Sequence, residues 1–151
     1  MPFLTYTPLN PASVLAELGA PGLGGTALFL GTVRQGEDDG PVIAIEYSAY
    51  EVMAEAEAGR IMAEASQRWP QTRVVVQHRV GRVAVGEASV LVVAASPHRA
   101  EAFAACRYVI EEVKHRLPVW KKELYADGTA GWRANDGSRQ PAAAPRLLRQ
   151  E

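Results

Sequence analysis

Cysteine is almost absent from this sequence of 151 residues, because Cys106 is the only one. An internal disulfide is therefore impossible, which is typical of proteins from a reducing compartment. Long apolar runs are also missing, and none reaches the roughly 20 residues that a membrane-spanning helix needs. Residues 1–5 lack the charged segment and apolar stretch of a signal peptide. The sequence predicts a cytoplasmic protein that makes no contact with a membrane.

A large excess of either charge is missing too, because 16 Lys and Arg residues stand against 17 Asp and Glu residues. A general nucleic-acid-binding protein would carry a basic excess, so we expect no nucleic-acid partner. The length suits one domain with one core. The positive charge is nevertheless uneven, since residues 98–122 contain six Lys or Arg and three Glu. This local excess of +3 marks a basic region.

Metal-ligand patterns are lacking as well. The three histidines, His78, His98 and His115, show no spacing such as H-x-x-x-H, and no second cysteine is present. We therefore expect no metal and no cofactor. Residues 22–25 (GLGG) are not predicted to bind phosphate, because a phosphate-binding loop follows a strand and opens a helix, and the order here is reversed.

The periodicity of apolar residues predicts an α+β fold, with a mainly antiparallel sheet and the order αββαββαβ. Asn10 and Pro11 begin a short helix that ends near Gly19. Further helices are predicted at residues 51–69 and from Ser96 to Pro118. Strands are predicted at residues 26–34, 42–50, 72–80, 88–95 and 119–125, with a short one left open within 81–87. The first two strands are expected to form a hairpin. Residues 1–133 form a single domain in this interpretation, and residues 134–151 a flexible tail.

The segment Ser96-Pro97-His98-Arg99 joins a valine-rich strand to a helix. A helix N-terminus attracts anions and disfavours a cation by about 0.3–1 kcal/mol, so a histidine and an arginine here call for a negative partner. This favours an anion site over side chains that merely reach water. Arg99 is expected on the buried face, in line with an apolar stripe formed by Phe103, Cys106, Ile110, Val113 and Leu117. On that stripe, Cys106 is more typical of a buried, inert thiol than of a nucleophile.

A second cationic segment, residues 114–123, reads KHRLPVWKKE. Its first three cations occupy the last turn of the helix, where they interact favourably with the dipole. Lys121 and Lys122 lie beyond the helix, beside Trp120, and strand alternation does not decide which of them turns inward. Lys114 follows Ile110 by four residues, so apolar surface is expected to lower its pKa. The segment favours a basic pocket for an anionic ligand over scattered surface charge.

Several blocks occur in a specific order: Phe29-x-Gly31-x-Val33-Arg34, Glu46-Tyr47, His78-Arg79-Val80-Gly81, Val85-Gly86-Glu87, Ser96-x-His98-Arg99-x-x-Ala102-Phe103, Lys114-x-x-x-Pro118-x-Trp120-Lys121-Lys122-Glu123, Gly128 and Trp132. Together they resemble the MoaE family, the catalytic subunit of molybdopterin synthase. The resemblance implies an α/β-hammerhead type of α+β fold and a homodimer. It also implies a partner, a small ubiquitin-like sulfur carrier with a Gly-Gly C-terminus, and with it a heterotetramer.

The resemblance further implies a sulfurtransferase. Sulfur from the carrier's C-terminal thiocarboxylate would pass to cyclic pyranopterin monophosphate (precursor Z), forming the dithiolene of molybdopterin in molybdenum cofactor biosynthesis. Lys121 and Lys114 match the family's catalytic lysines. The residues that match its substrate-binding positions are Arg34, His98, Arg99, Phe29 and Ile110, with His98 and Arg99 coming from the other protomer.

The sequence departs from the family in its C-terminal part, where the segment from Ala126 to Trp132 is also slightly longer than in the family. The family has an arginine a few residues after the tryptophan that Trp132 matches, whereas here Arg133 follows at once and Asp136 takes the later position. Neither Arg133 nor Arg139 is therefore assigned to the site. Two other readings remain: a non-catalytic anion-binding or regulatory module, and an adaptor for a ubiquitin-like partner. Two lysines are more than anion binding needs, which favours the enzyme.

Overall fold

The computed structural model describes residues 1–35 and 41–133. Its elements are β1 (Leu4–Thr5), α1 (Pro11–Leu18), β2 (Gly25–Thr32), β3 (Val42–Ala49), α2 (Glu51–Arg68), β4 (Arg73–Arg79), β5 (Gly81–Ala84), β6 (Ala88–Ser96), α3 (Arg99–Arg116), β7 (Val119–Tyr125) and β8 (Ala130–Arg133). The α+β prediction is confirmed, and all strand pairs are antiparallel except β1–β4. The flexible tail predicted for residues 134–151 lies outside the described residues.

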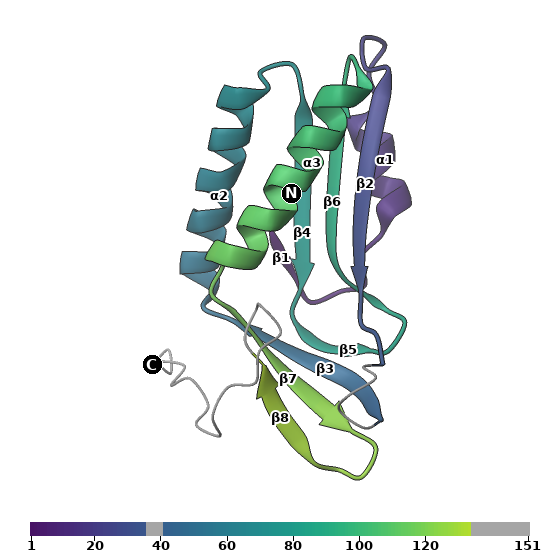
Figure 1. Cartoon of the computed structure of the whole chain (residues 1–151), viewed down its shortest axis with the longest axis vertical. Helices are drawn as coiled ribbons and strands as arrows, with labels where there is room; N and C mark the ends of the chain where they lie inside the picture. The colour runs from purple at the N-terminus through teal and green to yellow at the C-terminus, as the bar shows by residue number, and fades with distance from the viewer. Residues whose placement is uncertain (36–40, 134–151) are drawn as a thin grey trace.

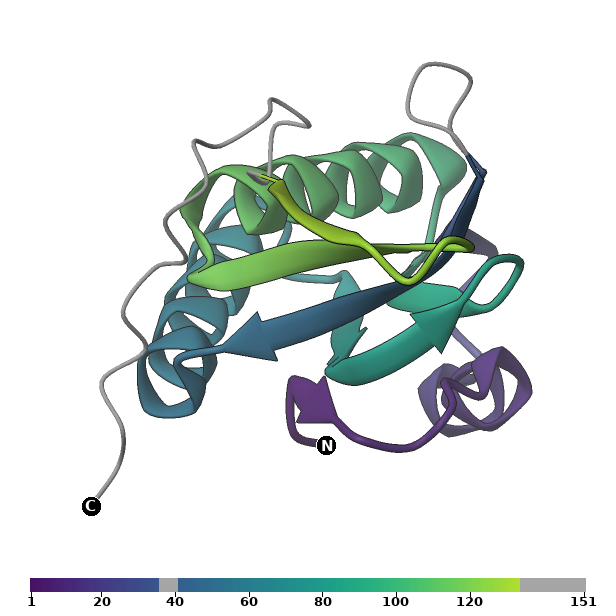
Figure 2. The same ribbon diagram turned by 90° about the horizontal axis from the view of Figure 1, so that it is seen from below.

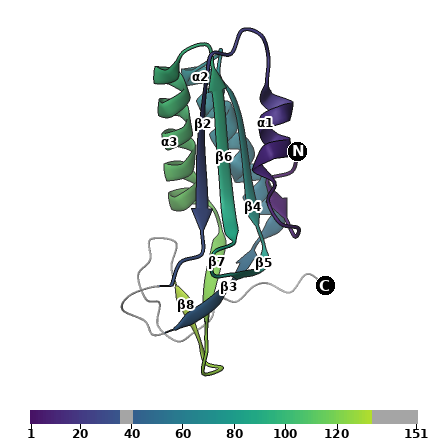
Figure 3. The same cartoon turned by 90° about the vertical axis from the view of Figure 1, so that its right-hand side faces the viewer.

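The larger structural unit is a four-stranded sheet, in the order β1-β4-β6-β2, with helices on both faces. Helices α2 and α3 cover one face and α1 covers the other (Figures 1 and 3). Strand β6 is buried along almost its whole length, because Val90 and Val92 face the two long helices while Leu91 and Val93 face α1. Burial on both faces explains why this strand is a continuous apolar run rather than an alternating one.

A second four-stranded sheet, in the order β5-β3-β7-β8, lies at the lower end of the molecule (Figures 1 and 2). The strands thus form two sheets, and the predicted hairpin between residues 26–34 and 42–50 was wrong. Strand β2 pairs with β6, and β3 pairs with β5 and β7. Neighbours in sequence often pair, but here long-range apolar contacts to β6 determine the partner of β2. Strands β1 and β8 were not predicted from the sequence, since they have only two and four residues.

The ends of α1 and α2 are as predicted, whereas α3 begins at Arg99 rather than at Ser96, which is the last residue of β6. The Asn10 side chain accepts a hydrogen bond from the Ser13 backbone N–H at 3.2 Å and so caps α1. In α3, Cys106, Ile110 and Val113 are buried as expected. Phe103 and Arg99 are exposed, however, which corrects the prediction that they belong to the buried face. The buried stripe runs instead through Ala102 and Ala105, whose small side chains allow the first turns of the helix to lie close to the sheet.

Two of the motifs stabilise the turn between the sheets. Gly81 and Gly86 both have a φ of 89°, which side chains other than glycine rarely adopt. Nη1 of Arg79 lies 2.7 Å from a carboxylate oxygen of Glu87, which ties β4 to the turn before β6. The Gly86 N–H donates to the Val33 carbonyl at 2.7 Å, and the Val33 N–H donates to the Glu87 carbonyl at 2.9 Å. These bonds fix the chain that follows β2.

Candidate active site

A cavity of about 230 Å³ lies where the C-terminal end of α3 meets both sheets. Four cationic side chains and one carboxylate line it, and both predicted lysines are among them. Its lining residues are Gly31, Thr32, Val33, Arg34, Ile45, Tyr47, Ser89, Lys114, Lys121, Glu123 and Arg133. The fold thus brings Arg34, which follows β2, together with Lys114 on α3 and Lys121 on β7, which lie much later in the chain. An excess of three positive charges favours an anionic ligand.

Strand register places Lys121 in the cavity. Lys121 lies opposite Tyr47 on β3 and opposite Arg133 on β8, and the side chains of all three line the cavity. Lys122, the next residue, has its ammonium 5.7 Å from the centre of the Trp132 ring in a cation–π contact. The structure therefore answers the question that strand alternation left open: of the two lysines, Lys121 turns toward the cavity.

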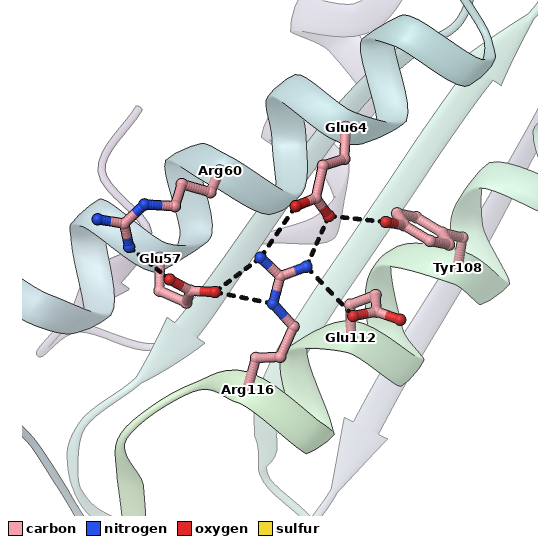
Figure 4. A network of polar contacts seen from close by, with 6 residues as sticks. All are labelled: Glu57, Arg60, Glu64, Tyr108, Glu112 and Arg116. Atoms are coloured by element: carbon pink, nitrogen blue, oxygen red, sulfur yellow. Dashed lines mark hydrogen bonds and ion pairs between the residues drawn. The ribbon is translucent and has the colours of Figure 1, made fainter.

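An ion-pair network around Arg116 holds the C-terminal end of α3 (Figure 4). Arg116 contacts Glu57 at 2.7 Å and Glu64 at 2.6 Å on α2, as well as Glu112 at 3.2 Å on its own helix. Glu64 also accepts a hydrogen bond from the Tyr108 hydroxyl at 2.7 Å. The network fastens the last turn of α3, which carries Lys114, to α2.

The electrostatics of the cavity favour proton transfer at Lys114. Burial, and then the positive charge of Lys121, lower the pKa of Lys114 from its ordinary 10.5 to about 8. Behind the cavity, burial lowers the pKa of His78 to about 4, and both lysines act in the same direction. The His78 ring packs edge-on against the Tyr47 ring, with 4.9 Å between the two ring centres. His78 therefore stays neutral at pH 7, whereas Lys114 can exchange a proton near neutrality.

The other predicted site residues lie elsewhere in this chain. His98 and Arg99 line a separate cavity with Gly24, Pro97 and Ala100, at the N-terminal end of α3. An α-helix of 18 residues is about 27 Å long, so one chain does not bring these two residues to Lys114. Phe29 is 39% exposed on β2, and Ile110 is buried in the core, and neither lines the lysine cavity.

Several residues that line the cavity were not predicted from the sequence: Tyr47, Ser89, Glu123 and Arg133. Gly128, with a φ of 86°, was the available signal for Arg133, because a glycine in that conformation allows a tight turn. The turn sends β8 back along β7 and puts Arg133 beside Lys121. Arg139 lies outside the described residues.

In residues 1–35 and 41–133, no group of three or more His, Cys, Asp or Glu side chains is arranged to hold a metal ion. None of the helices in these ranges has the length and apolar character needed to cross a membrane. Cys106 is buried as expected, and burial raises the pKa of its thiol, which disfavours the reactive thiolate.

The fold and the cavity define a class: a two-sheet α+β protein with a cationic pocket that contains a lysine of lowered pKa. A family model described as "MoaE protein" matches residues 4–116. The molybdopterin synthase catalytic subunit of Nostoc sp. is 44% identical over 130 residues, which cover 85% of this chain and 79% of that protein. The chain belongs to the MoaE family.

Solved structures agree with that assignment. Molybdopterin synthase from Staphylococcus aureus has a TM-score of 0.83 and 30% identity, covering 88% of this chain and 96% of that one. A complex of subunits 1 and 2 of molybdopterin-converting factor from Helicobacter pylori has a TM-score of 0.73 over 85% of this chain and 87% of that one. At 22% identity the latter likeness concerns the fold alone. Family membership assigns the chain to molybdenum cofactor biosynthesis.

Proposed function

We propose that this chain is the sulfur-transferring subunit of a molybdopterin synthase. Sulfur passes from the C-terminal thiocarboxylate of a small ubiquitin-like carrier to cyclic pyranopterin monophosphate, and two transfers form the dithiolene of molybdopterin. The observation that carries the proposal is the convergence of Lys114, Lys121 and Arg34 in one cavity. Both reactants are anions, and a cavity with an excess of three positive charges is suited to hold them together.

The two lysines have different roles in this proposal. Transfer of sulfur from an acyl group develops negative charge on the acyl oxygen, and a fixed ammonium in a water-poor pocket stabilises that charge. Lys121 is fixed for this task in the middle of a strand paired on both sides. Lys114, whose pKa is about 8, is neutral in about a tenth of molecules at pH 7. It can therefore accept and return a proton during the reaction.

The anion-binding residues come from two protomers of a homodimer. Arg34 is exposed and lines the same cavity as the lysines, where it can bind the substrate phosphate. His98 and Arg99 are exposed at the far end of α3, so we assign them to the cavity of the second protomer. Phe29, exposed on the edge strand β2, is assigned to the wall of the pocket that receives the carrier's tail. Ile110 contributes from the core, one helical turn before Lys114.

The assembly in this proposal is a heterotetramer of two such chains and two carriers. Its support is the family membership and the two-subunit complex of the Helicobacter pylori protein with the same fold. Light scattering of the purified chain, alone and mixed with carrier, tests the assembly. A monomer that does not bind carrier would contradict it.

The decisive experiment mixes the purified protein with thiocarboxylated carrier and precursor Z and measures molybdopterin. A module that only binds anions, or an adaptor, would give no product. Lys121→Ala should lower the rate by ~10²–10³, the usual loss on removing such a donor. Lys114→Ala should lose most activity, and Lys122→Ala, the matched control, should lose little. Near-normal single-turnover transfer by Lys121→Ala would show that the assigned roles are wrong.

A further inference from the structure

Arg133 is a fourth cation in the cavity, and neither the motifs nor the family pattern assigned it a role. It ends β8, opposite Lys121 on β7, so the two side chains are direct cross-strand neighbours on one face of the sheet. The Arg133 side chain is only 12% exposed. A cation that is largely removed from water but lines a cavity is suited to bind a ligand rather than to serve solubility.

The guanidinium of Arg133 is held in place by the carboxylate of Glu123. Its Nε lies 3.0 Å from a carboxylate oxygen of Glu123, whose side chain is 15% exposed. The other oxygen of that carboxylate accepts a hydrogen bond from the Tyr125 hydroxyl at 2.9 Å. An arginine anchored at Nε has lost most of its rotamer freedom before a ligand arrives, so binding costs less conformational entropy.

The charges of the cavity show why Arg133 matters. Glu123 is two residues from Lys121 on the same strand, and both line the cavity. Without Arg133, the Glu123 carboxylate would offset one of the three remaining cations, and the excess would fall from three positive charges to two. With Arg133 paired to Glu123, the cavity keeps its excess of three positive charges, which favours an anion.

We propose that Arg133 is a substrate-binding residue, whose guanidinium binds an anionic oxygen of the phosphate or carboxylate class in the cavity and is positioned by Glu123. The inference rests on the proposed function, because it takes the anion to be the pterin phosphate or the C-terminus of the carrier. A guanidinium suits both, since it presents paired N–H donors to two oxygens of one group.

The first test uses inorganic phosphate as the probe and needs no turnover. Arg133→Gln should weaken phosphate binding, measured by calorimetry on the folded protein, by about 10-fold to 100-fold, as expected for a hydrogen bond to a charged group. Arg133→Lys keeps the charge and should recover part of the affinity. Arg73→Gln, an exposed arginine on β4, is the matched control and should bind as wild type. Unchanged phosphate affinity in Arg133→Gln would overturn the proposal.

The second test measures turnover and identifies the source of the anion. If Arg133 binds the pterin phosphate, Arg133→Gln should raise KM for that substrate more than it lowers kcat. If it binds the carrier's tail, the variant should weaken binding of the intact carrier but not of a carrier without its two terminal glycines. Loss of kcat with both binding constants unchanged would contradict the inference. If wild type makes no molybdopterin, the proposed function fails, and the phosphate measurement still decides the role of Arg133.

Discussion

Replacing Lys114 with methionine should stabilise the protein while removing most of its activity. The folded state lowers the pKa of Lys114 from 10.5 to about 8, chiefly by burial. Each pKa unit corresponds to about 1.4 kcal/mol, so the charged lysine costs the folded state about 3 kcal/mol at pH 7. Methionine keeps the apolar stem and removes the charge, and we expect a gain of about 2–3 kcal/mol in the free energy of unfolding.

The pH dependence of this gain distinguishes the charge from mere packing. Because the pKa of Lys114 is lower in the folded state, the unfolded chain binds more protons between pH 8 and 10.5, and stability rises with pH there. The penalty is complete below pH 8 and gone above 10.5. The advantage of Lys114→Met should therefore fall from about 3 kcal/mol at pH 7 to about 1 kcal/mol at pH 10.

Urea unfolding followed by tryptophan fluorescence, at equal protein concentrations, measures both quantities. Lys122→Met is the control, because Lys122 lies over the Trp132 ring rather than in the cavity, and it should show no gain of this kind. The reasoning would be refuted if Lys114→Met were no more stable than wild type at pH 7. It would also be refuted if the difference in the free energy of unfolding between variant and wild type were the same at pH 7 and pH 10. If Lys114→Met is more stable but loses turnover, the native lysine lowers the stability of the fold and is needed for activity.

Three further predictions concern the surroundings of the cavity. Lys121→Met should raise the pKa of Lys114, because it removes the neighbouring positive charge that helps to lower that pKa. NMR titration of labelled lysine side chains would measure the pKa, and an unchanged value would disprove the electrostatic coupling of the two lysines. Hydrogen bonds from Arg116 hold the pKa of Glu64 at about 2, below its ordinary 4.5, so their contribution is present above pH 4.5 and is lost as the pH falls toward 2. Arg116→Ala should lower the melting temperature at pH 7 and flatten this acid dependence, and an unaltered acid profile would count against the network. Gly31→Ala should destabilise the protein by about 1–3 kcal/mol, because the added Cβ would lie 2.6 Å from Val90 Cγ1. Gly59→Ala is the control, because an added Cβ there meets open space. Thermal melts compare the two variants, and equal melting temperatures would contradict the close packing at Gly31.

The sequence by itself determined the local elements and the identity of the two lysines. Asn10 and Pro11 begin α1 because a side-chain cap and a fixed φ act over a few residues. Pro118 stops α3, which ends at Arg116 with Leu117 as its C-cap, because proline lacks the N–H that a further turn needs. Lys114 was singled out because it borders an apolar stripe, whereas the choice of Lys121 over Lys122 came from the resemblance of the sequence blocks to the MoaE family.

Only the tertiary structure decided which residues share the cavity. Strand pairing over long separations divides the strands into two sheets, and a local pattern carries no information about the partner of a strand. Register then turns Lys121, not Lys122, into the cavity and brings Arg133 beside it. The length of α3 keeps His98 and Arg99 away from the lysines of the same chain. The pairing of β2 with β6 and of β3 with β7 depends on contacts between segments far apart in sequence, which the packing of the whole chain determines.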